Sequence, residues 1–289
     1  MLDYRMDTFL AVCEAMNYTR AAEALGLTQP AVSGHIRMLE EEYGVKLFSY
    51  AGKKLTLTKA GEILKRSAIT LQHDETVLKQ RMGGAADLRK HMRFGATKTA
   101  GPYAAAFPLC DFLKRNDDIN IKLVIDDTKN LLELLDRGEI DFALVEGNFP
   151  RNDYESVRYS EEPFCAVTAP GHVFKKRNVR RAEDLVGERL LIREKGSGTR
   201  DVLEAYLKNE NLSIENFTDI VEINDLEMLK ILAEEDCGIT FLYETAVEKE
   251  LEEGLLEKIR IKGFAVSHDF AIIRRKGSIF PDSGAELFG

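Results

Sequence analysis

The sequence has few cysteines and no long hydrophobic run. The four cysteines among 289 residues are far apart and show no Cys-x-x-Cys spacing, which argues against a zinc site and a disulfide framework. No apolar segment approaches the roughly 18 residues that a membrane helix needs. The N-terminus mixes acids with apolar residues and lacks a signal-peptide pattern, so we expect a cytoplasmic protein without a membrane partner. The thiols expected to be buried are Cys13, Cys110, Cys165 and Cys237.

Signatures of catalysis are also missing. The chain contains no His-Glu-x-x-His or Gly-x-Ser-x-Gly motif, and its five histidines show no catalytic spacing with cysteine. His35 falls within a predicted helix, and we expect the other histidines at the surface. An enzyme is the main alternative, because α/β domains with clefts often catalyse reactions. We nevertheless expect no catalytic residue, metal or cofactor. A transport binding protein, the third alternative, would need a signal peptide and would leave the N-terminal helices unexplained.

The net charge of −9 is unevenly distributed along the chain. Residues 1–90 hold 13 Lys and Arg against 11 Asp and Glu, which leaves 27 against 38 for the remainder, so the two parts carry +2 and −11. Residues 46–66 contain six cations and only one acid, Glu62. Such a cluster can bind phosphate even in an acidic protein.

The N-terminal residues predict three helices with a tight turn before the third. The first helix is expected from Leu2 to Met16, and Thr19 is placed to cap a second, short helix. Thr28 is placed to cap a third helix, and Gly44 follows its end. The second and third segments therefore predict a helix-turn-helix.

The third helix has one apolar and one small, polar face. Val32, Ile36 and Leu39 recur at helical spacing and should face the core, which turns the opposite face outward. In a DNA major groove, glutamine can pair with adenine, serine can read several base edges, and proline can contact a thymine methyl group. A solvated helix face is the alternative. The next segment favours DNA binding, because residues 47–58 read as a β-hairpin wing with lysines at its tip. The candidate DNA-binding residues are Thr19, Thr28, Gln29, Pro30, Ser33, Gly34, Arg37, Lys53 and Lys54.

Residues 21–48, AAEALGLTQPAVSGHIRMLEEEYGVKLF, and the following LTLTKAGE closely resemble the N-terminal signature of the LysR-type transcriptional regulators. The resemblance covers Phe9 to Glu62. It implies that Gln29, Pro30 and Ser33 face the bases and that Lys53 reaches the DNA backbone or minor groove. Gly34 departs from the pattern, since many relatives carry a long polar or basic residue there. The operator sequence is therefore expected to differ.

The segment from Thr58 to about Arg81 predicts one long helix. Leu64, Leu71 and Leu78 lie one heptad apart, which suggests pairing with a second copy, although packing on its own domain is an alternative. The family resemblance implies a dimer, or a tetramer, that presents two recognition helices to two half-sites of double-stranded promoter DNA. RNA polymerase is a further expected partner.

Beyond the hinge at residues 83–90, strands alternate with helices. This pattern predicts an α/β sensor domain with mostly parallel sheets, in which ligands lie at the carboxyl ends of strands and near helix starts. The Gly-Ser-Gly-Thr loop is the most informative segment, because its glycines allow close approach and a helix start favours an anion. Helix capping is the alternative for each hydroxyl, including Thr128. The predicted strands are MRFGAT, INIKLVID, DFALVEG, PFCAVTA, RLLIR, DIVEI, GITFL and DFAIIRR. The candidate effector-binding residues are Thr97, Lys98, Thr99, Thr128, Glu146, Gly147, Gly196, Ser197, Gly198, Thr199 and Asn224.

The family resemblance continues more loosely over residues 92–280. It implies two α/β lobes like those of a periplasmic binding protein, with the effector between them and Asn224 nearby. The REKGSGTR run resembles the branch linked to sulfur metabolites and other small anions. The usual last helix of the first lobe is reduced to PDSGAELFG.

The expected fold is thus an α/β protein that joins an all-α winged helix-turn-helix and a long linker helix to a two-lobed sensor. The expected function is DNA-binding regulation by a small, anionic effector, whose binding changes how the lobes and subunits pack. The predicted boundaries are 1–58 for the winged domain, 59–90 for the linker helix and hinge, 91–289 for the sensor, 91–162 with 263–289 for lobe 1, and 163–262 for lobe 2.

Overall fold

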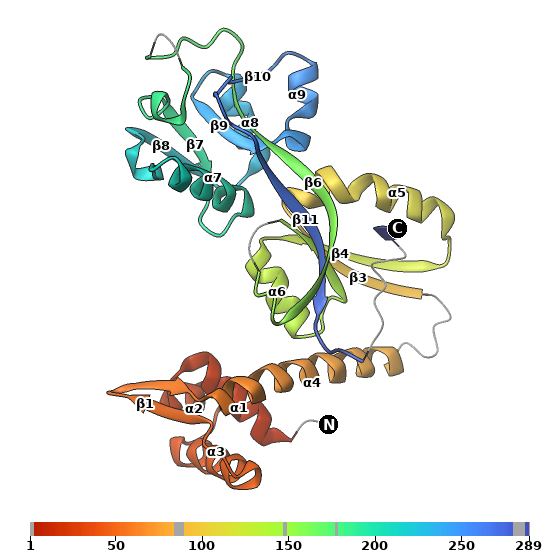
Figure 1. Ribbon diagram of the computed structural model, residues 1–289. Coiled ribbons are helices and arrows are strands. Elements are labelled where there is room, and N and C mark those ends of the chain that lie inside the picture. The colour runs from red at the N-terminus through yellow and green to blue at the C-terminus, as the bar shows by residue number, and fades with distance from the viewer. Residues whose placement is uncertain (1–2, 84–89, 147–148, 177–178, 280–286, 289) are drawn as a thin grey trace. The chain divides into compact units, whose positions relative to one another are not determined.

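The computed structural model comprises two compact units (Figure 1). The N-terminal unit contains residues 1–88 together with 134–139 and 275–281, and the C-terminal unit contains 89–133, 140–274 and 282–289. The structure describes residues 3–83, 90–146, 149–176, 179–279 and 287–288.

The N-terminal unit builds three short helices, a hairpin and one long helix around a single core. Its elements are α1 (Tyr4–Ala15), α2 (Tyr18–Leu25), α3 (Gln29–Tyr43), β1 (Phe48–Ala51), β2 (Lys54–Leu57) and α4 (Lys59–Gly83). Val32, Ile36 and Leu39 of α3 are buried as predicted, and they pack with Phe9 and Val12 of α1. The apolar spacing of the helices therefore fixes which face of α3 remains accessible.

The caps of α3 are also as predicted. The Thr28 hydroxyl accepts a hydrogen bond from the Ala31 N–H at 3.4 Å, and Gly44 ends the helix in the left-handed conformation. The predicted cap of α2 is wrong, because the helix begins two residues earlier than expected. Asn17 is the N-cap, and its side chain accepts hydrogen bonds from the N–H groups of Thr19 and Arg20. Thr19 is exposed in the first turn.

Within the described residues, the C-terminal unit forms a nine-stranded mixed sheet with helices packed against it. In the first lobe the elements are β3 (Lys90–Thr97), a π-helical turn η1 (Gly101–Ala105), α5 (Ala106–Arg115), β4 (Ile119–Asp126), α6 (Thr128–Asp136) and β5 (Phe142–Val145). The second lobe follows with η2 (Ala182–Asp184), β7 (Arg189–Arg193), α7 (Gly198–Asn209), η3 (Ile214–Asn216), β8 (Asp219–Ile223), α8 (Leu226–Glu234), β9 (Ile239–Tyr243), η4 (Glu244–Ala246), α9 (Glu248–Glu252) and β10 (Glu257–Lys258).

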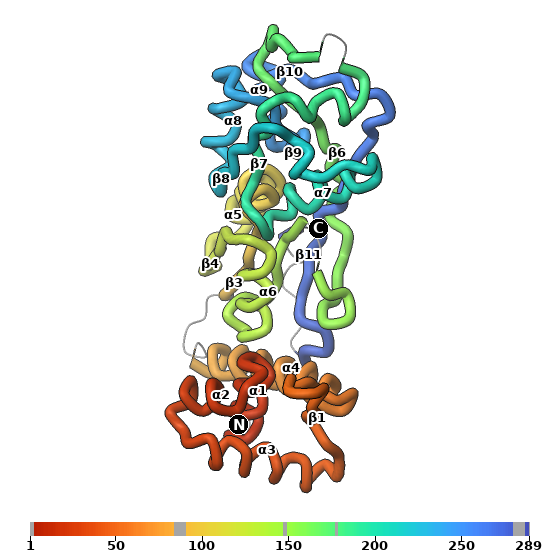
Figure 2. Tube along the Cα trace, turned by 90° about the vertical axis from the view of Figure 1, so that its left-hand side faces the viewer, coloured from red at the N-terminus to blue at the C-terminus, as the bar shows by residue number. Residues whose placement is uncertain are grey.

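Two long strands, β6 (Tyr154–Thr168) and β11 (Val266–Arg275), connect the lobes and can be followed in Figures 1 and 2. Strand β3 runs parallel to β4 and β5, and β7 runs parallel to β8 and β9. The connecting strands pair antiparallel, β11 with β5 and β6 with β9, so the sheet is mixed rather than mostly parallel. The sheet order is β4-β3-β5-β11-β6-β9-β7-β8, and β10 pairs with β6.

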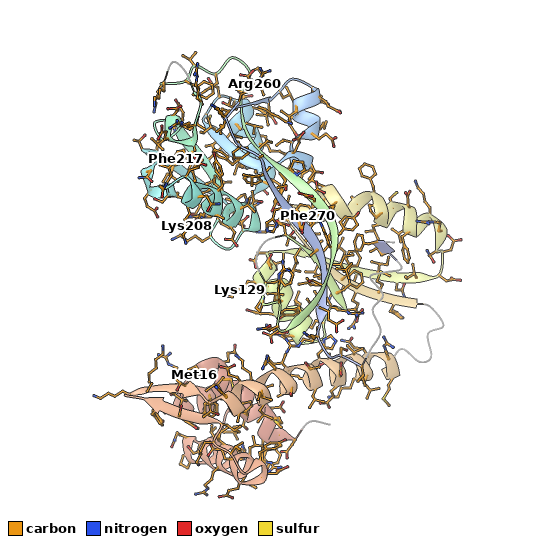
Figure 3. The ribbon with its side chains drawn as sticks, viewed as in Figure 1. Met16, Lys129, Lys208, Phe217, Arg260 and Phe270 are labelled. Atoms are coloured by element: carbon orange, nitrogen blue, oxygen red, sulfur yellow. The ribbon has the colours of Figure 1, made fainter. Side chains whose placement is uncertain are left out.

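Aromatic side chains fill the cores of both lobes. Phe270 lies on β11 (Figure 3). It is fully buried and packs edge-on against Tyr243, with ring centroids 4.9 Å apart. In the first lobe Phe94 stacks on Phe142 at 5.1 Å. Phe288 packs edge-on against both of these rings. Residues 280–286 lie outside the described residues.

The expectations for thiols and histidines are only partly correct. Cys13 and Cys165 are buried, but Cys110 is exposed. His73 is buried in the N-terminal unit, where its Nδ1 lies 2.6 Å from the carbonyl oxygen of Leu135. The polar ring of His73 can be buried because the backbone carbonyl of Leu135 is its hydrogen-bond partner.

Across the described ranges, no helix is long and apolar enough to cross a membrane.

Candidate functional site

The accessible face of α3 carries the predicted DNA-reading side chains. Gln29 and Pro30 are exposed in its first turn, while Ser33 and Gly34 are half-buried one turn later. The Gln29 Nε2 donates a hydrogen bond to the Ser33 Oγ at 2.8 Å. Arg37 extends the same face, and its side chain is 73% exposed. This face is polar and narrow, and at Gly34 an added Cβ would meet nothing within 4 Å.

The predicted wing is a two-stranded hairpin. Strands β1 and β2 pair from Phe48 with Leu57 to Ala51 with Lys54. Gly52 adopts a φ of 64° in the turn, which glycine allows without strain. Lys53 and Lys54 are exposed, and neither forms an ion pair with a residue that the structure describes. Their charges are therefore available to phosphate groups.

The long helix α4 has both an inward and an outward leucine. Leu64 packs against the core of its own unit. For this leucine, the alternative to pairing with a second copy therefore holds. Leu71 and Leu78 are 51% and 48% exposed. The heptad is therefore divided, and its C-terminal two leucines remain accessible.

The two lobes of the C-terminal unit meet where strand ends and helix starts come together. Thr99, which follows β3, lies 3.3 Å from Thr199 in the first turn of α7, measured between the hydroxyl oxygens. Lys98 donates to the Glu194 Oε1 at 3.1 Å, also between lobes. We call the side chains of Thr97, Lys98, Thr99, Glu146, Arg193, Glu194, Ser197, Thr199 and Tyr243 the interlobe cluster.

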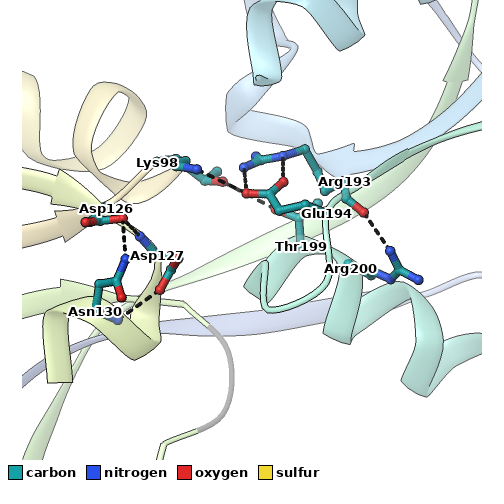
Figure 4. Close-up of polar contacts among 9 residues, drawn as sticks. Lys98, Asp126, Asp127, Asn130, Arg193, Glu194, Thr199 and Arg200 are labelled. Carbon is teal, nitrogen blue, oxygen red and sulfur yellow. Dashed lines mark hydrogen bonds and ion pairs between the residues drawn. The ribbon is translucent and has the colours of Figure 1, made fainter. Parts of the chain in front are cut away.

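Glu194 neutralises two cations at once (Figure 4). Besides Lys98, its carboxylate accepts hydrogen bonds from the Arg193 Nε at 2.8 Å and Nη2 at 3.1 Å. Burial raises the pKa of Glu194, but the hydrogen bonds and charge of Arg193 outweigh it, so the pKa lies below its ordinary value. The Arg193 Nη1 is buried and has no hydrogen-bond partner among the described residues. One guanidinium nitrogen in this cluster is therefore unsatisfied.

A second carboxyl group, on Glu146, is enclosed in the same cluster. The Thr97 hydroxyl donates to it, and Gly198 approaches so closely that an added Cβ would lie 2.7 Å from the Glu146 Cγ. Burial raises the pKa of Glu146, and hydrogen bonds from Thr97 and Thr99 oppose that shift only in part. The Tyr243 hydroxyl is also buried and lacks a hydrogen-bond partner within the described part of the chain.

The structure places the remaining predicted effector residues as follows. Gly196 has a φ of 94°, as its loop requires, and Ser197 is the N-cap residue of α7 although its side chain makes no capping bond. Thr128 does not cap α6. Asp127 accepts from the Asn130 N–H at 2.9 Å, and the Thr128 hydroxyl donates to the carbonyl oxygen of Glu146 at 3.0 Å.

The predicted residue Asn224 does not join the cluster. Asn224 is exposed after β8 and forms no hydrogen bond with any residue in the described ranges. Gly147 lies outside the described residues. Sequence reasoning missed Arg193, Glu194 and Tyr243. The first two belong to the RLLIREK run, where charged residues directly after an apolar strand were the available signal.

A winged helix-turn-helix followed by a two-lobed α/β unit defines a class of ligand-responsive DNA-binding regulators. Family comparisons give the same answer for each part. Residues 4–62 match the model described as bacterial regulatory helix-turn-helix protein, lysR family, and residues 85–282 match the LysR substrate binding domain. The chain belongs to the LysR family of transcriptional regulators, which are not enzymes.

Individual relatives extend over nearly the whole chain. The RuBisCO operon transcriptional regulator of Allochromatium vinosum is 29% identical over 287 residues, covering 97% of this chain and 92% of that protein. The full-length regulator LysG of Corynebacterium glutamicum with bound effector Arg has a TM-score of 0.60 at 17% identity and covers 99% of this chain and 95% of its own. The regulatory domain of Synechocystis PCC6803 CcmR in complex with 2-PG has a TM-score of 0.59 at 18% identity, covering 68% and 92%. At these identities the two structures show a shared fold.

Proposed function

We propose that the effector of this regulator is a small anion that binds in the interlobe cluster. The observation that carries the proposal is the buried Arg193 Nη1, which has no partner among the described residues. An unsatisfied, buried, charged donor costs free energy that an anionic acceptor would recover. The start of α7 lies in the same cluster, where free N–H groups and the helix dipole also favour negative charge.

Glu194 sets the conditions for such binding. Its carboxylate is paired with both Lys98 and Arg193. An incoming anion must therefore share these two cations with Glu194 or displace its carboxylate from them. Because Lys98 and Glu194 belong to different lobes, displacement would break a contact that holds the lobes together. A ligand can shift a conformational equilibrium only through such a difference in affinity between two arrangements. Displacement of the Glu194 carboxylate by the effector would therefore change how the two lobes are held together, and this change is the proposed response to the effector.

On DNA, the proposed readers are Gln29, Pro30 and Ser33, with Lys53 and Lys54 contacting phosphates beside the groove. The exposed Leu71 and Leu78 support pairing of α4 with a second copy. A dimer would present two α3 helices to two half-sites, so that a change in subunit packing alters their spacing.

The test is a thermal-shift and calorimetric titration of the full-length protein with sulfate, sulfite, O-acetylserine, citrate and 2-PG. A ligand at a hundred times its Kd stabilises the protein by about 2.7 kcal/mol. Binding should weaken in Thr199→Val and persist in the matched surface variant Lys208→Gln. If no anion binds, the anionic effector is wrong, while membership of the regulator family stands. A bound anion that leaves the DNA footprint unchanged would refute the coupling.

A further inference from the structure

A groove of about 480 Å³ lies on the two strands that connect the lobes. Its lining includes Ser156, Arg158 and Glu161 from β6, and Asp269 from β11. The turn before β6 contributes Arg151. None of these residues belongs to the interlobe cluster. The volume is within the range of about 300–1,000 Å³ typical of small-molecule sites.

A hydrogen-bonded network fixes one wall of the groove. The Arg158 Nη2 donates to Glu161 at 2.5 Å, and its Nε lies 2.8 Å from the Asp269 Oδ1. Ser267 donates its hydroxyl to the other oxygen of Glu161 at 2.5 Å. Hydrogen bonds from Ser267 and Arg158 hold the pKa of Glu161 below its ordinary value. These side chains are thus oriented before any ligand arrives, which reduces the entropy lost on binding.

The other wall carries polar groups that the protein does not satisfy. The Arg151 guanidinium lies 5.9 Å from the centroid of the Phe149 ring and forms no ion pair with a residue the structure describes. The His268 Nδ1 is buried and also has no hydrogen-bond partner within those ranges. The Arg151 guanidinium is exposed and can donate to an acceptor in the groove, whereas the His268 Nδ1 is too deeply enclosed to contact one. A carboxylate is the acceptor that guanidinium groups bind most effectively in two-point geometry.

The charges of the lining restrict the ligand further. Arg151 and Arg158 are balanced by Glu161 and Asp269, so the groove does not suit a polyanion. The acid group of a ligand would bind Arg151. The second oxygen of Asp269 is then the natural acceptor for a hydroxyl group, because only Oδ1 faces Arg158.

From this arrangement we infer that the groove is a second ligand site, specific for a small hydroxylated carboxylate. The acid group binds Arg151, and a hydroxyl group binds Asp269. Since the lining comes from both connecting strands, the occupied site ties β6 to β11 and stiffens the link between lobes.

The test is isothermal titration of the full-length protein with D-gluconate, D-glycerate and shikimate. D-Glucose is the control without a carboxylate, and hexanoate is the control without hydroxyl groups. At least one hydroxy acid should bind more tightly than both controls. Arg151→Gln should weaken that binding about tenfold or more, because it removes a charge-assisted contact. Arg151 is exposed, so this variant should fold, which circular dichroism verifies. Lys208→Gln, which removes an exposed cation on α7 (Figure 3), should bind as the wild type does.

The same titrations in Thr199→Val separate this site from the interlobe cluster. Binding that survives Thr199→Val and weakens in Arg151→Gln supports the inference, whatever the effector proves to be. Binding that weakens only in Thr199→Val places the hydroxy acid in the interlobe cluster and overturns the second site. The inference is equally overturned if none of the three acids binds, or if glucose or hexanoate binds as well as they do.

Discussion

Replacing Gly61 with alanine should destabilise the N-terminal unit, whereas the same change at Gly34 should stabilise it. Both glycines lie in helices, so each gains about 1 kcal/mol of helix propensity. At Gly34 an added Cβ meets nothing within 4 Å. At Gly61 it would lie 2.2 Å from the carbonyl oxygen of Leu47, a distance that must open to at least 3.0 Å, which is a displacement of 3.0 − 2.2 = 0.8 Å.

The obstacle at Gly61 is backbone that is itself hydrogen-bonded. The Leu47 carbonyl accepts from the Thr58 N–H at 3.0 Å, and the Thr58 hydroxyl accepts from the Gly61 N–H at 3.0 Å. Moving Leu47 therefore disturbs the start of α4. Overpacking costs about 1–3 kcal/mol, and a lost cap costs about 1 kcal/mol. After the propensity gain, the net loss is about 1–3 kcal/mol.

Scanning calorimetry of the two full-length variants measures this difference. For a unit of this size, 1 kcal/mol changes Tm by about 4–8 °C. Gly61→Ala should lower the Tm of its transition by about 4 °C or more, and Gly34→Ala should raise it by a similar amount. If both variants shift in the same direction, the argument from close approach is refuted.

Three further predictions concern the effector site and assembly. Glu146→Gln should stabilise the protein relative to wild type increasingly as the pH rises. In the wild type, burial raises the folded-state pKa of Glu146 above the unfolded-state pKa, so the protonated carboxyl stabilises the folded protein fully at pH values below the unfolded-state pKa. This stabilisation is lost as the pH rises through the raised folded-state pKa. Urea denaturation from about pH 4 to about pH 8 measures this, and a constant difference would contradict it. Glu194→Gln should free Lys98 and Arg193 and raise citrate affinity about tenfold in calorimetric titration. Unchanged or weaker binding would argue against competition between Glu194 and the anion for these cations. Leu71→Lys should shift the sedimentation coefficient toward the monomer without unfolding the chain, since this side chain is 51% exposed; an unchanged assembly would exclude α4 pairing through it.

Local chemistry made much of the N-terminal unit predictable. Thr28 and Gly44 delimit α3 through bonds to residues within one turn, so the sequence pattern contains the necessary information. The start of α2 was misplaced because Asn17 and Thr19 are both good capping residues in the same short segment. The helix selects Asn17, whose side chain reaches two free N–H groups. That choice depends on backbone geometry that residue type alone does not specify.

For the interlobe cluster, the sequence predicts which loop positions contribute residues but not which side chains pair with one another. Thr99 and Thr199 were expected from their places after strands, and the structure brings their hydroxyls together. The ion pairs among Lys98, Arg193 and Glu194 were not expected, because Lys98 and Glu194 are 96 residues apart in the sequence and belong to different lobes. Asn224 was carried over from the family pattern, yet the strand before it leaves its side chain exposed.

The hydrogen bond between Gln29 and Ser33 has a consequence for how this protein searches DNA. In the free protein this hydrogen bond uses one N–H group of Gln29 and one acceptor position of the Ser33 hydroxyl, so α3 offers fewer free polar groups to an arbitrary sequence. In the proposed DNA complex, base edges must separate the two side chains, and only edges that replace the lost partner on each side compensate for the separation. At a wrong base, one of the two side chains would be left without a hydrogen-bond partner after the contact between Gln29 and Ser33 has been broken. In the proposed DNA complex, the contact would act as a small energetic threshold that shortens the time spent at incorrect sites, and the wing lysines Lys53 and Lys54 would keep the protein close to the duplex.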